Sequence, residues 1–243
     1  MRIKAQFKTE KIPLGYRMMM VSLIKEALRQ GNEEYYKQLY ESGDSVMKPF
    51  SYAPFLHNFE IQEPTISLEN LSITFSSPDP EFILYLYNGL LKLDKFQYQD
   101  FHLKKDRIIP LQEYTIRSNR AIFRSLSPLL IDDENNNPLS PEDPAYKSHL
   151  NYIADLILKN YRGKGLTEEL GVETGRMKKE VIKENYRDFN ESESVEGWLY
   201  FTGYKGYFQL EGAPVDLQLL YQLGLSKRRG QGFGFLELEK EVK

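Results

Sequence analysis

Hydrophobic residues recur along this chain at two spacings, one typical of strands and the other of helices. Residues 2–8 alternate between apolar and polar positions, which predicts a first strand. From Pro13, apolar residues follow at helical spacing until Gly31-Asn32, and a shorter helix is predicted over 33–40. A helix opening at Pro80 then separates extended segments predicted over 50–61, 71–75 and 95–109. The resulting order, β-α-β-β-α-β, is that of ferredoxin-like domains, which RNA-recognition domains share.

The second half repeats this plan more loosely. It has an extended segment over 114–131, an acidic loop with three prolines over 132–144 and an amphipathic helix over 145–161. Strands are expected over 176–186 and 195–210, paired across the polar stretch 188–194, followed by a helix over 215–225 and a strand over 232–238. We therefore predict an α+β fold of two tandem ferredoxin-like (RNA-recognition-like) β-α-β-β-α-β domains, residues 1–112 and 113–243.

Composition narrows the class of protein. The chain has 243 residues, is 41% hydrophobic and contains no cysteine, so disulfides and thiolate metal sites are excluded. No apolar run approaches the ~18 residues of a membrane span, and the N-terminal residues do not resemble a signal peptide. These features predict a cytoplasmic protein without a membrane partner. A net charge of −3 argues against an indiscriminate nucleic-acid binder, although the cations are clustered.

The segment from Gly224 to Phe235 combines four glycines with three consecutive cations. Glycine adopts positive φ and allows close approach, so such a loop can turn its N–H groups toward a phosphate. The cations add an attraction for nucleic acid that does not depend on base sequence. No Gly-Lys-Ser/Thr follows, and the alternation after Gly230 predicts a strand, so neither a Walker loop nor a dinucleotide fingerprint fits. The pattern favours RNA binding over the alternative, a solvated hairpin tip.

Three segments resemble motifs of the CRISPR-associated endoribonucleases that cut repeat RNA (the Cas-six family). The ending, 223–235, is similar to the family's glycine-rich loop, with Ser226 in place of one small residue. Ser125-Leu-Ser-Pro-Leu-Leu-Ile131 is similar to the strand that opens its second domain, and Met47-Lys-Pro-Phe-Ser-Tyr52 to a strand after its first helices. The motifs follow in order along the whole chain, and the tandem fold agrees with them.

The resemblance implies a metal-independent endoribonuclease that matures guide RNA by cleaving CRISPR repeat RNA. Attack by a 2′-hydroxyl leaves a 2′,3′-cyclic phosphate and a 5′-hydroxyl, without metal or cofactor. The chain departs from the family where a histidine is usual, because it reads Leu39-Tyr40-Glu41-Ser42-Gly43. A tyrosine, with a reference pKa near ~10, is a poor base at neutral pH. One alternative is a non-catalytic homologue that binds repeat RNA as an effector-complex subunit, and another is a protein-binding module without RNA.

Candidate catalytic residues follow from these matches. Lys48 can stabilise charge on the phosphate, and Tyr40 can orient the 2′-hydroxyl, with Tyr36 and Lys37 on the same short helix. Tyr36 and Tyr40 lie four residues apart, so simple packing is the alternative. His57 is the best histidine for proton transfer, whereas His102 is expected to be structural and His149 to be an exposed or packing residue. Lys25, on the first predicted helix, is expected to be solvated, although the resemblance implies that this helix ends near the family's active site.

Candidate RNA-binding residues come from the loop and from one strand of the second half. Lys227, Arg228 and Arg229 are expected to contact phosphates, and the strand cations to grip a repeat stem from one face. The full set is Gly224, Ser226, Lys227, Arg228, Arg229, Gly230, Gly232, Gly234, Arg176, Lys178 and Lys183. The expected partner is CRISPR repeat RNA, joined in the non-catalytic alternative by other effector-complex subunits, and the expected state is a monomer or homodimer.

Overall fold

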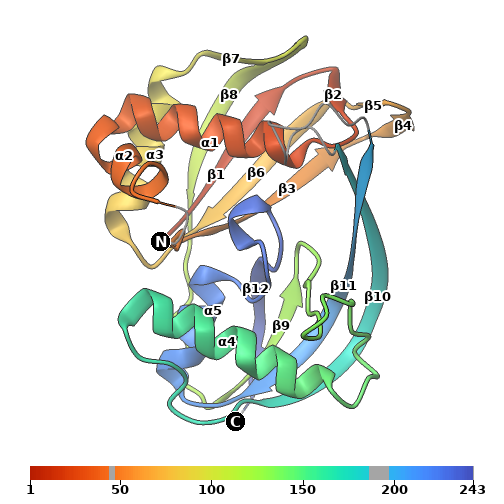
Figure 1. Cartoon of the computed structure of the whole chain (residues 1–243). Helices are drawn as coiled ribbons and strands as arrows, with labels where there is room; N and C mark the ends of the chain where they lie inside the picture. The colour runs from red at the N-terminus through yellow and green to blue at the C-terminus, as the bar shows by residue number, and fades with distance from the viewer. Residues whose placement is uncertain (44–46, 186–196, 243) are drawn as a thin grey trace.

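The computed structural model describes residues 1–43, 47–185 and 197–242, which form two α+β halves in tandem (Figure 1). The predicted polar stretch 188–194 and the predicted strand ends at 186, 195 and 196 lie outside the described residues. The elements of the first half are β1 Arg2–Lys8, β2 Lys11–Pro13, α1 Arg17–Gly31, α2 Glu33–Tyr40, β3 Ser51–His57, β4 Glu60–Gln62, β5 Thr65–Ser67, β6 Asn70–Ser76, α3 Pro80–Lys92, β7 Lys95–Tyr98 and β8 Phe101–Leu111.

The second half has fewer described elements, but two of its strands, β10 and β11, are longer than any in the first half. Its elements are β9 Arg120–Ser125, α4 Tyr146–Arg162, β10 Gly171–Asn185, β11 Trp198–Glu211, α5 Pro214–Leu223, a 3-10 turn at Arg229–Gln231 and β12 Leu236–Glu241. In Figure 1, α4 and α5 lie in front of the sheet, while β10 and β11 rise along one side to the first half. None of the helices in the described ranges is apolar over enough turns to span a membrane.

The two larger sheets have the ferredoxin-like strand order, and β2, β5 and β4 form a third, small sheet. The first is antiparallel in the order β3-β6-β1-β8-β7, and the second in the order β10-β11-β9-β12. β7 is an added edge strand. Without it, the four main strands of each sheet lie side by side in the order second, third, first, fourth, counted along the chain. Helices cover one face of each sheet (Figure 1). The predicted tandem ferredoxin-like fold is confirmed.

Local sequence explains where most helices begin and end. Asn32 accepts a hydrogen bond from the Tyr35 N–H at the start of α2, and Asp79 accepts one from the Glu81 N–H at the start of α3. Pro80 occupies the first turn of α3, where its missing N–H costs nothing. Apolar residues at helical spacing then turn one face of α1 into the first core, at Met19, Met20, Leu23, Ile24, Ala27 and Leu28.

Three predicted elements had wrong limits in the first half, and one of them is the extended segment 95–109, which is two strands, β7 and β8. Pro13 does not begin a helix, because residues 11–13 form β2 and pair with β5, and α1 begins only at Arg17. The extended segment 50–61 is two strands, β3 and β4. The proposed domain limit, residues 112 and 113, falls in the connection between the end of β8 and the start of β9.

Two arginines of the first half tie it to the second. Arg2 donates to the Leu236 carbonyl at 2.6 Å and pairs with Glu237 at 2.8 Å. The buried Arg17 pairs with the buried Glu184 at 3.1 Å, and its guanidinium lies 4.6 Å from the Phe233 ring. Phe233 belongs to the glycine-rich loop, so the halves meet where that loop lies.

Candidate functional site

The glycine-rich loop joins α5 to β12 and consists of turns. Gly232 and Gly234 have φ values of 83° and 69°, and Arg228, at 57°, lies in the same left-handed region. Strand backbone does not adopt these angles. The last strand therefore begins at Leu236, and the prediction that it begins at Gly232 was wrong.

The loop lies against residues 47–52 of the first half. A Cβ atom on Gly232 would stand 2.8 Å from a ring carbon of Tyr52, and one on Gly230 would stand 3.4 Å from Cγ of Lys48. On another side, Ser127 Oγ accepts a hydrogen bond from the Phe235 N–H at 2.9 Å. The three segments that carried the sequence motifs, far apart along the chain, therefore meet in space.

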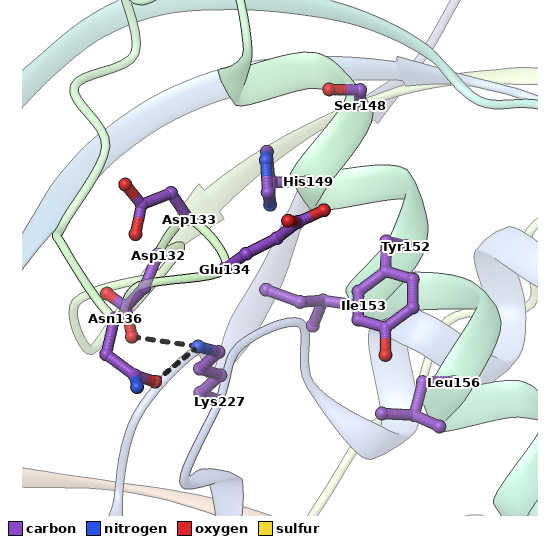
Figure 2. Close-up of a pocket in the computed structure, with 10 residues that line it drawn as sticks. All are labelled: Asp132, Asp133, Glu134, Asn136, Ser148, His149, Tyr152, Ile153, Leu156 and Lys227. Carbon is purple, nitrogen blue, oxygen red and sulfur yellow. Dashed lines mark hydrogen bonds and ion pairs between the residues drawn. The ribbon is translucent and has the colours of Figure 1, made fainter.

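The three consecutive cations have three different environments. Lys227 pairs with Asp132 at 3.2 Å and donates to Asn136 Oδ1 at 3.4 Å (Figure 2). Arg228 is exposed, with its guanidinium 4.8 Å from the Phe201 ring. Arg229 is buried and donates to the Leu223 carbonyl at 2.7 Å, at the C-terminus of α5. Burial lowers the pKa of Arg229 to about 10.

This arrangement corrects the expectation that all three cations face RNA. Arg229 satisfies a helix-terminal carbonyl inside the protein, so it supports the loop and has no open path to a phosphate. Ser226 is also buried, and its hydroxyl accepts from the Leu130 N–H at 2.8 Å. The remaining loop residues divide between a buried set, Gly224, Gly232 and Gly234, and a surface set, Lys227, Arg228 and the half-buried Gly230.

Beside the loop, the Tyr40 ring lies close to two lysines. Its ring centroid is 4.7 Å from Nζ of Lys48 and 5.2 Å from Nζ of Lys25 on α1. Lys48 Nζ also donates to the Leu39 carbonyl, which holds the side chain over α2. Burial raises the pKa of Tyr40 above its ordinary value, so its hydroxyl stays protonated at neutral pH.

Tyr36 and Arg29 extend this cluster along α2. The Tyr36 and Tyr40 rings stack with centroids 5.6 Å apart, as their helical spacing allows. The Arg29 guanidinium lies 4.6 Å from the Tyr36 ring and donates to its hydroxyl at 3.1 Å. Three cations thus lie close to the two tyrosine rings of α2. Two of them come from α1, and the third, Lys48, follows α2 in the chain. We call Lys25, Arg29, Tyr36, Tyr40 and Lys48 the cation–tyrosine cluster.

Two other candidates lie outside this cluster. Lys37 is exposed and pairs with Glu33 at 3.0 Å, one helical turn away. His57 is at the opposite end of β3 from Ser51, roughly 20 Å along the strand at about 3.3 Å per residue. Its Nε2 is 2.9 Å from Ser72 Oγ, and its ring packs against Phe55. The structure therefore brings Tyr36, Tyr40 and Lys48 together and leaves His57 and Lys37 apart.

A cavity of about 450 Å³ between α1 and β7 adjoins the cluster. Lys25, Arg29 and Lys95 line it together with one acid, Glu26, so its charge is positive. Cations beside a cavity attract phosphate oxygens. The surface running from this cavity past Tyr40 to Gly230 is the best candidate for contact with an anionic polymer.

A family model described as CRISPR associated protein Cas6, C-terminal, matches residues 109–238, more than half of the chain. This chain belongs to the Cas6 family. A search of curated proteins found no match. Among solved structures, one described as a Cas6-related gene product from Pyrococcus furiosus is 20% identical, with a TM-score of 0.80, covering 100% of this chain and 99% of that one.

Two further structures support the same fold. A protein described as an RAMP protein binding different RNA substrates is 18% identical, with a TM-score of 0.78 and coverage of 99% and 100%. A Cas6 product complex is 16% identical, with a TM-score of 0.61 and coverage of 98% of both chains. At these identities the likeness establishes the Cas6 fold, and residue roles have to be argued from this chain.

The cations of β10 in this Cas6 protein do not share one face. Arg176 and Lys178 are exposed, but Lys183 is five positions after Lys178, and strand alternation turns it to the other side. Lys183 pairs with Glu63 of the first half at 3.0 Å and lies 4.4 Å from the Trp198 ring. The expectation of one gripping face was wrong for Lys183, which links the two halves.

Sequence reasoning missed Arg29 and set Lys25 aside as solvated. Both lie on α1, and only the packing of α1 against α2 brings them to the tyrosines. The signal available in the sequence was their spacing of four residues, which matches that of Tyr36 and Tyr40 on the next helix.

Proposed function

We propose that this Cas6 protein is a metal-independent endoribonuclease that cleaves CRISPR repeat RNA and so matures guide RNA. The observation that carries the proposal is the cation–tyrosine cluster beneath the glycine-rich loop. Lys48 and Lys25 lie close to Tyr40, and Gly230 of the loop borders Lys48. Family membership supports the RNA substrate, because an RNA-binding protein and a Cas6 product complex share this fold.

In this reaction, the 2′-hydroxyl oxygen forms a bond to phosphorus while the bond from phosphorus to the 5′ oxygen breaks. The 2′-hydroxyl loses a proton, the 5′ oxygen gains one, and the products are a 2′,3′-cyclic phosphate and a 5′-hydroxyl. Negative charge grows on the phosphate oxygens in the transition state. A fixed ammonium group lowers that barrier more than a mobile one. Lys48, held by the Leu39 carbonyl and the Tyr40 ring, fits this role.

Tyr40 suits proton donation better than proton abstraction. Burial raises its pKa, so a deprotonated Tyr40 is scarce at neutral pH. The protonated hydroxyl can donate to the leaving 5′ oxygen or orient the scissile phosphate. Lys25 adds a second positive charge close to the ring. His57, at the far end of β3, would have to act on a different part of the RNA.

The second candidate is a non-catalytic homologue that binds repeat RNA as an effector-complex subunit. The observation that favours it is the tyrosine at position 40, where a histidine is usual in the family. In the described ranges, the histidines lie on β3, β8 and α4, away from α2. RNA binding by the positive cavity and Arg228 would remain in this case.

Repeat RNA labelled at its 5′ end, incubated with the purified protein in EDTA, separates the candidates. We expect a shortened product whose 3′ end cannot be ligated until the cyclic phosphate has been opened and the remaining phosphate has been removed. An intact but shifted band on a native gel would replace the proposal with the binding function. Cleavage that requires added magnesium would contradict the mechanism, and RNA that neither binds nor breaks would contradict both functions.

A further inference from the structure

A second cavity, of about 730 Å³, lies between the acidic segment 132–136 and the outer side of α4 (Figure 2). Its charged lining is three carboxylates, Asp132, Asp133 and Glu134, against one lysine, Lys227. Lys227 is already paired with Asp132 and bonded to Asn136. The cavity is therefore negative overall, in contrast to the cavity beside α1, and it repels RNA phosphates.

The α4 side of this cavity presents an apolar stripe. Tyr152 and Leu156 are 66% and 43% exposed, although they lie on the helix whose other face builds the second core. With His149 and Ile153 they follow the i, i+3, i+4, i+7 spacing of one helix face. Single exposed apolar residues need no explanation, but these are neighbours, one turn apart, beside a cavity. Figure 2 shows Tyr152, Ile153 and Leu156 together along α4.

The acidic wall is held in a fixed shape. Asp133 accepts hydrogen bonds from the Asn135 N–H at 2.8 Å and from the Asn137 N–H at 2.8 Å. A third bond, from the Asn137 side chain, leads the interactions that lower the pKa of Asp133. This carboxylate consequently stays charged at neutral pH and below. Glu134, beside it, is exposed and reaches the cavity from the same turn.

We propose that this cavity and the α4 stripe form a docking site for a basic amphipathic helix of a partner protein. The partner's apolar residues would pack on Tyr152 and Leu156 at helical spacing, and its Lys or Arg side chains would reach Asp133 and Glu134. Charge complementarity selects this occupant, because an acidic helix and RNA both meet a wall of like charge. The inference goes beyond the RNA-cleaving function and does not depend on it.

Fluorescence anisotropy with a synthetic peptide tests the site. The probe is a short labelled helix with leucines at i, i+3, i+4 and i+7 flanked by lysines, and its match has every lysine replaced by glutamate. We expect the lysine peptide to bind the full-length protein and the glutamate peptide to bind at least tenfold more weakly. Equal binding of the two peptides, or binding of neither, would overturn the proposal.

Matched variants locate the binding. Leu156→Ser should weaken binding of the lysine peptide about tenfold. Leu84→Ser, at a 53% exposed leucine on α3, should leave this binding unchanged. Glu134→Lys should weaken it similarly, and Glu168→Lys, at another exposed glutamate, should not. Asp133 is left intact because it holds the turn. Loss of binding in the control variants, or displacement of the peptide by repeat RNA, would exclude a protein-docking site here.

Discussion

The cavity beside α1 and the cavity beside α4 carry opposite charges on one protein. The first has three cations and one carboxylate, and it adjoins the two tyrosines of α2. The second has three carboxylates and one cation, with an exposed tyrosine and leucine on its helix. A net charge of −3 for the whole chain conceals this separation. The average charge of a protein therefore says little about its partners, because recognition depends on where the charges are fixed.

Lys48→Ala gives the largest effect and tests whether the positive side performs chemistry. Loss of one transition-state contact of this kind costs ~10²–10³ in rate. We expect single-turnover cleavage of repeat RNA to slow by about that factor, with a much smaller change in binding. Lys37→Ala is the control, because Lys37 is an exposed lysine paired with Glu33. Equal rates for Lys48→Ala and the parent protein would remove Lys48 from the active site.

Gly232→Val tests whether the loop is needed beside the cluster. The valine Cβ would lie 2.8 Å from a ring carbon of Tyr52, and the backbone φ at this position is 83°. Strained backbone and overpacking each cost about 1–3 kcal/mol, so we expect the melting temperature to fall by roughly 5–20 °C. Gly163→Val is the matched control, because its φ is 74° and its surroundings are open. Measured by calorimetry, the melting temperature should fall less for the Gly163 control than for Gly232→Val. Similar decreases in the two variants would show that the Tyr52 contact is unimportant.

The double variant Lys25→Gln/Arg29→Gln addresses the contrast in charge directly. We expect it to weaken RNA binding about tenfold, which corresponds to about 1.4 kcal/mol. Glu134→Gln, in the negative cavity, should leave RNA affinity unchanged. Binding titrations at one fixed salt concentration compare the two. If Glu134→Gln weakens RNA binding as much as the double variant does, then the two cavities do not divide their partners by charge.

The variants Arg228→Ala and Arg229→Ala distinguish the roles of two adjacent arginines, one expected to contact RNA and the other to support the fold. Each lost phosphate contact lowers the slope of log K against log salt by roughly 0.7–0.9. We expect this change for the exposed Arg228 and none for the buried Arg229. Arg229→Ala should instead lower stability by about 1–3 kcal/mol, because the Leu223 carbonyl loses its partner. A reduced slope for Arg229→Ala would mean that the loop opens when RNA binds.

The smallest expected effect is that of pH on the cleavage rate. The raised pKa of Tyr40 keeps its hydroxyl protonated at neutral and mildly alkaline pH. If Tyr40 donates the proton, the single-turnover rate should be flat between about pH 6 and pH 9. A rate that bends near ~6.5, the reference pKa of a histidine, would assign proton transfer to a histidine.

The order of elements along the chain and most helix limits were predictable because short-range patterns set them. Alternation and helical spacing identify β1, α2 and α3, and Pro80 marks the start of α3 directly. The prediction that a helix begins at Pro13 was wrong because proline is tolerated both in a first helical turn and in an edge strand. Only the pairing with β5 decides between the two. The motif residues 47–52 and 224–235 were found in the sequence, but their contact was not visible there.

The individual site residues were less predictable because burial depends on partners remote in sequence. Arg228 and Arg229 are neighbours with the same chemistry, yet one is exposed and the other is buried beneath the end of α5. From the sequence alone, Lys183 is expected to be a surface cation. Its contacts with Glu63 and Trp198 are visible only in the structure. Lys25 and Arg29 join the cluster only through the packing of α1 on α2.

The contact between Gly230 and Lys48 also has a consequence for protein synthesis. The ribosome makes Lys48 and the tyrosines of α2 well before the loop that borders Lys48. At ~5–20 residues per second, roughly 10–40 s of translation separate residue 48 from residue 230. During that interval the nascent chain carries the cation–tyrosine cluster without its loop. We therefore expect the site to mature only after the loop has been synthesised.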